Sequence, residues 1–269
     1  MTPERRTVRV GTKDVRLLVG GDGPPLLYLH SVGADVDWLE AHERLARRFT
    51  VHLPAHPGFA ESTGVEQVDG IFDVVLHYVD LLAALGLARV PVVGTSFGGW
   101  IGAEIAALYP ERVERLVLID AVGLWVDAAP IGELFGSTPP ELARLLFHDQ
   151  DHPLAQMLHA MTSIADVPED FAYAQLKALE AAAKVGWNPY LHDPKLEGRL
   201  GRVTAPTLVL WGREDGLVPL VYGERYRDRI PGARLEVLER CGHLPAIERP
   251  AEFADAVLRF LSVGRSPAS

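Results

Sequence analysis

The clearest chemical pattern in the chain is Gly94-Thr-Ser96-Phe-Gly98, which directly follows an apolar segment at residues 90–93. A Gly-x-Ser-x-Gly sequence between a strand and a helix is typical of a nucleophile elbow, a tight turn that exposes the serine hydroxyl. The turn leaves no room for side chains at positions 94 and 98, so glycine is needed at both. We therefore predict that Ser96 is a nucleophile, held with a strained backbone at a helix N-terminus.

A serine hydroxyl is a weak nucleophile, so it needs a base, and that base needs a carboxylate to orient it. His243 is the best of the ten histidines, because it lies in a loop between the last predicted strand and the last predicted helix. Asp215 follows the preceding strand and can reach the same edge of the sheet, whereas its neighbour Glu214 is expected to face away. Asp120, which ends another predicted strand, is a rival for the role of acid.

Acyl transfer also needs hydrogen-bond donors for the oxygen that becomes negatively charged in the transition state. We expect two backbone amides to form this oxyanion hole. One is that of Phe97, which follows the nucleophile and opens the helix. The other is that of Val32, in the loop after the strand that ends at His30.

Strands and helices alternate on both sides of a central helical region, which predicts βαβ units and a mostly parallel sheet flanked by helices. Two short strands are expected within residues 7–21, around the turn at Gly11–Thr12. Further strands are expected at 25–30, 49–53, 90–94, 113–120, 206–212 and 234–238, and helices at 36–47, 71–85, 98–109, 218–230 and 250–262. Between about 122 and 200 the pattern is helical, with helix starts at Thr138-Pro-Pro-Glu141 and Asp166-Val-Pro-Glu169. We therefore predict an α/β core formed by residues 1–121 and 202–269, with a helical cap at 122–201 over the edge of the sheet where such folds place their sites.

The composition excludes several classes of function. The 269 residues carry a formal net charge of −10, which argues against binding of nucleic acid. Cys241 is the one cysteine, so no intramolecular disulfide can form. We expect a cytoplasmic protein without membrane contact, because neither a signal peptide nor a long apolar run is visible. The segment His148–His152 is interpreted as an exposed polar turn, and neither a metal nor an organic cofactor is expected.

The order Ser96, Asp215, His243 and the elbow together resemble the α/β-hydrolase superfamily, in its capped branch of esterases, lactonases and C–C bond hydrolases. The similarity runs from about Leu26 to Leu261 and includes the loop Leu53–Ser62 and the stretch from Trp187 to Gly212. There are departures from the family pattern. His30-Ser31 stands where the family has His-Gly, and Thr95 and Leu244 stand where C–C hydrolases usually have asparagine and tryptophan.

Three functional hypotheses follow. In the first, the chain hydrolyses carboxylic esters of small to medium, largely apolar substrates through an acyl-enzyme on Ser96. In the second, the same triad cleaves a C–C bond of a ring-cleavage product, or acts as an enol-lactonase. The third is a non-catalytic ligand-binding protein, because a fold does not fix a function. The sequence leaves the natural substrate and the oligomeric state open.

Overall fold

Eight strands form one sheet in the computed structural model, which describes residues 1–33 and 35–263. Their order is β1-β2-β4-β3-β5-β6-β7-β8. β1 pairs antiparallel with β2, and β2 with β4, while every later pairing is parallel. The strands are β1 (Glu4–Val10), β2 (Lys13–Gly20), β3 (Pro25–Leu29), β4 (Thr50–Pro54), β5 (Val90–Thr95), β6 (Val113–Ile119), β7 (Thr207–Gly212) and β8 (Arg234–Leu238). The predicted α/β fold with a mostly parallel sheet is confirmed.

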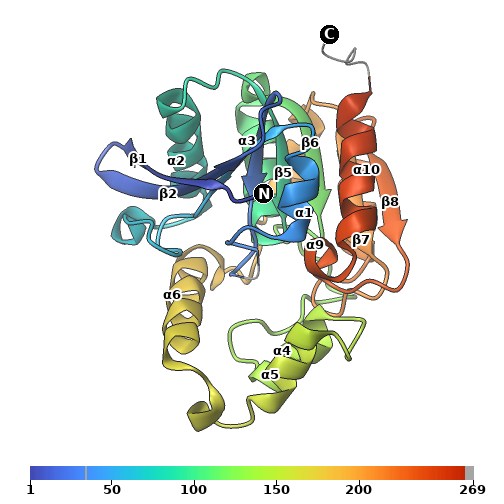
Figure 1. Ribbon diagram of the computed structural model, residues 1–269. Coiled ribbons are helices and arrows are strands. Elements are labelled where there is room, and N and C mark those ends of the chain that lie inside the picture. The colour runs from blue at the N-terminus through green and yellow to red at the C-terminus, as the bar shows by residue number, and fades with distance from the viewer. Residues whose placement is uncertain (34, 264–269) are drawn as a thin grey trace.

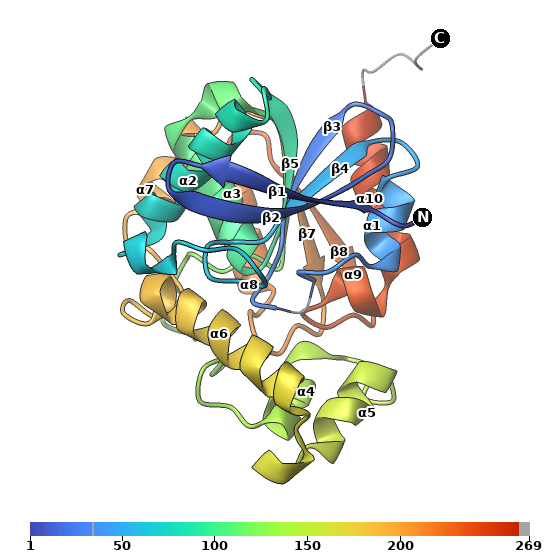
Figure 2. The same cartoon turned by 60° about the vertical axis from the view of Figure 1, so that its left-hand side comes forward.

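Helices cover both faces of the sheet, as Figure 2 shows. One face carries α2 (Ile71–Ala84), α3 (Phe97–Leu108) and α8 (Val221–Arg229), and the other carries α1 (Glu40–Leu45) and α10 (Pro250–Ser262). Successive side chains of a strand point to opposite faces, so both sides of the central strands are buried. In β3, for example, Leu27 and Leu29 join the first core, whereas Leu26 and Tyr28 join the second.

The chain between β6 and β7 contains helices and no named strand. These helices are α4 (Pro139–Leu146), α5 (Pro153–Ala160), α6 (Glu169–Gly186) and α7 (Leu196–Arg199). Figures 1 and 2 show α4, α5 and α6 as a separate layer beyond one end of the sheet, with α6 opposite α4 and α5. The capping box predicted at Thr138 is present, with its amide donating to the Glu141 carboxylate at 2.8 Å. The boundaries of the cap, at 122 and 201, stay a prediction.

Two helices differ from the sequence expectations. No helix start was predicted at 153, but Pro153 occupies the first position of α5, where a proline needs no amide hydrogen. His152 caps this helix by accepting a hydrogen bond from the Leu154 amide at 3.2 Å. The helix expected at 36–47 is shorter, because α1 spans Glu40–Leu45. None of the described helices is long and apolar enough to cross a membrane.

Candidate active site

The predicted nucleophile elbow joins β5 to α3. Ser96 has a φ of 51°, in the left-handed region that side chains rarely adopt. A Cβ at position 94 would lie 2.3 Å from the Gly98 carbonyl oxygen, and a Cβ at position 98 would lie 2.1 Å from the carbonyl oxygen of Leu29. Glycine is therefore required at 94 by the turn itself and at 98 by the end of the neighbouring strand β3.

The structure brings the three predicted triad residues together. His243 Nε2 lies 2.9 Å from Ser96 Oγ, and His243 Nδ1 lies 2.7 Å from Asp215 Oδ2. The other carboxylate oxygen of Asp215 accepts hydrogen bonds from the amides of Leu217 and Val218, both at 2.8 Å. All three triad residues are buried. The turn after β7 holds the Asp215 carboxylate in place through these two amides.

Glu214 and Glu248 hold the backbone of the histidine loop. Glu214 Oε2 accepts a hydrogen bond from the Cys241 amide at 2.9 Å, so Glu214 faces away from His243, as expected. Glu248 Oε2 accepts a hydrogen bond from the Gly242 amide at 2.7 Å. Two carboxylates outside the triad thus fix the loop that carries the base.

The same loop is attached to the helical layer. The His243 amide donates to the Leu146 carbonyl at the end of α4, at 2.8 Å. Glu248 Oε1 also accepts a hydrogen bond from the Asp149 amide, at 2.6 Å, in the link between α4 and α5. The α4–α5 half of the layer is therefore tied to the base itself, a connection that the sequence analysis missed.

Asp120, the rival acid, does not contact His243 through a hydrogen bond. It ends β6 with a φ of 44°, and its Oδ1 accepts a hydrogen bond from the Gly212 amide at 2.9 Å. Burial, together with the charge of Asp215, raises the pKa of the Asp120 carboxyl well above its ordinary value. In this geometry the carboxylate that contacts the imidazole is that of Asp215, and Asp120 instead accepts the Gly212 amide.

The amides predicted for the oxyanion hole lie next to the nucleophile and have no other acceptor within the described residues. Ser31 donates its amide to Asp35 Oδ1 at 2.6 Å, and Gly33 donates to the Ser31 carbonyl at 2.9 Å. This leaves the Val32 amide free in that part of the loop, and Val32 lines a small cavity together with Ser96 and His243. The Phe97 amide is the first of α3, so no preceding turn of the helix can accept its hydrogen. Both assignments stay predictions.

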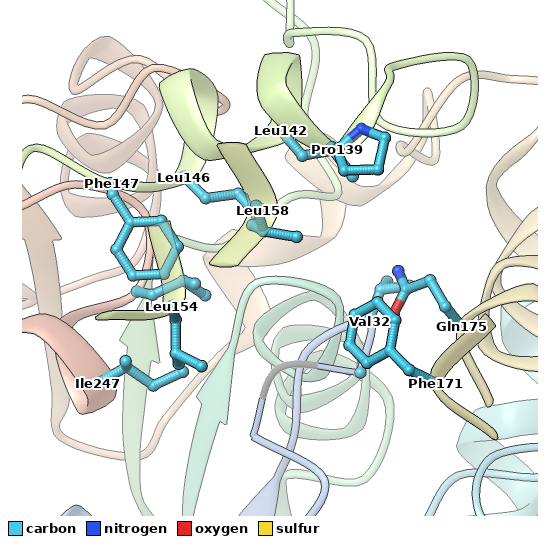
Figure 3. Close-up of a pocket in the computed structure, with 12 residues that line it drawn as sticks. Val32, Pro139, Leu142, Leu146, Phe147, Leu154, Leu158, Phe171, Gln175 and Ile247 are labelled. Carbon is cyan, nitrogen blue, oxygen red and sulfur yellow. The ribbon is translucent and has the colours of Figure 1, made fainter. Parts of the chain in front are cut away.

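An apolar cavity of about 210 Å³ adjoins this small cavity. The two share five lining residues, Val32, Leu142, Leu146, Gln175 and Leu244, so they lie side by side. Figure 3 shows how the helices divide its wall. Pro139, Leu142, Leu146, Phe147, Leu154 and Leu158 come from the α4–α5 side, and Val32, Phe171 and Gln175 stand opposite.

The cavity wall includes residues that the sequence analysis did not single out. Among the aromatic residues between β6 and β7, Phe147 lines the cavity, whereas Trp187 is 65% exposed and Trp125 stacks on His192. Gln175 and Phe171 were not considered, because an amphipathic helix shows which residues share a face but not what that face covers.

Residues 24–250 match the family model described as alpha/beta hydrolase fold. The chain belongs to the α/β-hydrolase family. Its relatives include 2-hydroxymuconate semialdehyde hydrolase of Pseudomonas sp. (strain CF600), 33% identical over 259 residues, which cover 90% of this chain and 88% of the relative. Another is 2-hydroxy-6-oxo-6-phenylhexa-2,4-dienoate hydrolase of Burkholderia cepacia, 28% identical, with 93% of this hydrolase and 92% of the relative covered.

A solved structure of a meta-cleavage product hydrolase, CumD, matches this hydrolase with a TM-score of 0.79 and 25% identity, over 96% of this chain and 98% of that chain. The enol-lactonase of Burkholderia xenovorans LB400, 22% identical with a TM-score of 0.77 over 96% of this chain and 100% of that chain, shares the fold. The relatives favour the second functional hypothesis, a C–C hydrolase or enol-lactonase, over the carboxylesterase hypothesis, and they do not exclude the latter.

Two further histidines of this hydrolase shape the loops beside the site. His56 donates its amide to His30 Nε2 at 2.9 Å, and His56 Nε2 lies 2.7 Å from the His30 carbonyl oxygen. Burial lowers the pKa of His56 to about 3, so its imidazole is neutral. No group of three or more potential metal ligands gathers within residues 1–33 and 35–263.

Proposed function

We propose that this chain is a serine hydrolase that cleaves carboxylic esters of uncharged, apolar substrates through an acyl-enzyme on Ser96. The observation that carries the proposal is the pair of adjoining, mostly apolar cavities beside the nucleophile. Among the described residues that line them, none is a lysine or arginine, and most are aliphatic or aromatic. A charged substrate group would lose its hydration there without gaining a partner, which is costly.

The arrangement of the triad supports a two-step mechanism. His243 Nε2 accepts the proton of Ser96 Oγ as that oxygen attacks the ester carbonyl, and Asp215 stabilises the resulting imidazolium. The amides of Phe97 and Val32 donate to the oxyanion. His243 then protonates the leaving alkoxide, and water attacks the acyl-enzyme with His243 again as base.

The size of the apolar cavity suggests substrates of moderate length. The larger cavity, at about 210 Å³, has room for an apolar chain of several carbon atoms. We therefore expect activity to rise from acetyl to butyryl and hexanoyl esters, because each added methylene buries more apolar surface.

The second candidate keeps the triad and changes the bond, to a C–C bond of a ring-cleavage product or to an enol-lactone. It is supported by the relatives that are named dienoate and semialdehyde hydrolases. The substrate named for the Burkholderia cepacia relative is a dienoate and so carries a carboxylate. The described residues of the cavity wall include no lysine or arginine, and this is the reason to place the candidate second.

The test compares wild type and Ser96→Ala on p-nitrophenyl acetate, butyrate and hexanoate, and on a dienoate ring-fission product. We expect multiple turnovers of the esters by wild type and a loss of roughly 10⁴-fold or more in kcat in the variant. Equal ester turnover by both proteins would refute the proposal. Strong preference for the dienoate would support the second candidate, and stoichiometric binding without product release would support the ligand-binding hypothesis.

A further inference from the structure

Asp120 has a carboxyl group that the mechanism above does not use. The side chain is completely buried at the end of β6. Its Oδ1 accepts a hydrogen bond from the Gly212 amide, but Oδ2 has no hydrogen-bond donor within the described residues. A buried, ionised carboxylate oxygen without a donor costs considerable free energy, so this oxygen calls for a proton.

The charged group with the largest effect on the pKa of Asp120 is another carboxylate, that of Asp215. Asp215 already accepts the Leu217 and Val218 amides on Oδ1 and faces His243 with Oδ2. Burial raises the pKa of Asp120 first, and the charge of Asp215 raises it second, with a smaller contribution from Glu248. Two neighbouring buried carboxylates repel each other, and Asp215 has three hydrogen-bond partners whereas Asp120 has one, so Asp120 is the group that calls for a proton.

We propose that Asp120 is a positioning residue, held as a neutral carboxylic acid whose Oδ2–H donates to the Asp215 carboxylate. This inference rests on the proposed function of the triad. Leu217 and Val218 hold Asp215 from its own turn, and Asp120 holds it from the neighbouring strand. These contacts keep the Asp215 carboxylate within hydrogen-bonding distance of His243 Nδ1.

Asp120 also contacts the backbone at the point where the Asp215 turn and the histidine loop lie against each other. It binds the amide of Gly212, the last residue of β7, from which the Asp215 turn begins. A Cβ at position 212 would lie 2.1 Å from the carbonyl oxygen of Gly242 in the histidine loop. A shift of Asp120 is therefore transmitted to both the acid and the base.

Two substitutions separate a neutral donor from a charged group. Asp120→Asn keeps an oxygen for the Gly212 amide and supplies N–H in place of O–H toward Asp215. We expect its kcat to stay within about threefold of wild type, with the acid limb of the kcat/KM profile unshifted. Asp120→Ala removes the donor and should lower kcat roughly 10- to 100-fold, with KM little changed.

If Asp120 is ionised, Asp120→Asn removes a negative charge beside His243. The acid limb would then move to lower pH, or kcat would fall as far as in Asp215→Asn, and either result overturns the proposal. Wild-type kcat in both Asp120 variants also overturns it. Failure of the proposed function has a different signature, since wild type itself would then not turn over esters.

An infrared measurement tests the protonation state without activity, and it decides the matter if Asp120→Ala does not fold. The C=O stretch of a protonated carboxyl group should be present in wild type at neutral pH and absent from Asp120→Asn. Asp255→Asn, at an exposed position on α10, is the matched control and should keep the band. The same spectrum from wild type and Asp120→Asn contradicts the proposal.

Discussion

At the scale of the residue, each triad member is positioned by contacts of its own local backbone, independently of the other two. Ser96 is fixed by the glycines at 94 and 98. Asp215 is fixed by two amides of its turn, and His243 by a loop whose preceding amides bind Glu214 and Glu248. Such preorganisation lowers the reorganisation needed during the reaction.

Replacing Asp215 by asparagine tests which carboxylate orients the base. The asparagine has nearly the same shape, but it favours the wrong imidazole tautomer and cannot stabilise the imidazolium, so we expect kcat to fall about 10⁴-fold. Glu214→Gln is the matched control, because an oxygen remains for the Cys241 amide. Steady-state kinetics on p-nitrophenyl butyrate measure both, and a larger loss in Glu214→Gln than in Asp215→Asn would reverse the assignment.

The sequence predicted Ser96, His243 and Asp215 because their signals are local: a glycine spacing, and loops after identifiable strands. It left Asp120 as a competing acid, since both aspartates end neighbouring parallel strands and chain order alone does not tell which one meets the imidazole. The choice is decided by tertiary contacts: Asp120 Oδ1 accepts the Gly212 amide, and Asp215 Oδ2 contacts His243.

At the scale of the element, the strands were easier to predict than the helices between β6 and β7. Buried parallel strands are continuous apolar runs, and all eight appear close to the expected positions. α5 was not predicted as a separate helix; it begins at Pro153, and proline is well suited to the first turn. The packing of α4, α5 and α6 around a cavity involves residues distant in sequence, which local patterns do not reveal.

The cavity wall offers a test of substrate charge at Gln175 on α6. Gln175 lines both cavities and stands opposite the α4–α5 residues in Figure 3. Gln175→Arg places a cation in an apolar cavity, where attraction to a carboxylate is strong. We expect the ratio of kcat/KM for a carboxylate-bearing dienoate to that for p-nitrophenyl butyrate to rise by about tenfold or more.

Gln175→Met is the control for size, since it removes the amide without adding charge. It should leave the dienoate-to-ester ratio within about threefold of wild type, because one uncharged side chain replaces another. An unchanged ratio in Gln175→Arg, with ester activity intact, would mean that the substrate carboxylate does not reach this wall.

At the scale of the whole molecule, the two faces of the sheet form separate cores, and several histidines are buried in them. His42, His56 and His77 are each nearly inaccessible, and burial lowers their pKa values to about 3, about 3 and about 4. Each is therefore neutral in the folded chain at a pH where the unfolded chain would protonate it. This makes the stability of the hydrolase dependent on pH through groups outside the triad.

His77 on α2 gives the sharpest test, because neither of its ring nitrogens has a hydrogen-bond partner within the described residues. Between pH 6.5 and about 4 the unfolded state binds the extra proton, so stability falls as pH falls. The decrease from pH 7 to pH 5 that is due to this one group is about 2 kcal/mol. His77→Leu should remove that part of the decrease, whatever its effect on stability at pH 7.

Urea unfolding of wild type and His77→Leu at pH 7 and pH 5 measures this difference directly, because contributions from the other titrating groups cancel between the two proteins. His148→Leu, at an exposed position between α4 and α5, is the matched control and should show the wild-type decrease. If wild type and His77→Leu lose the same stability between the two pH values, His77 either has a hydrogen-bond partner or becomes protonated in the folded chain.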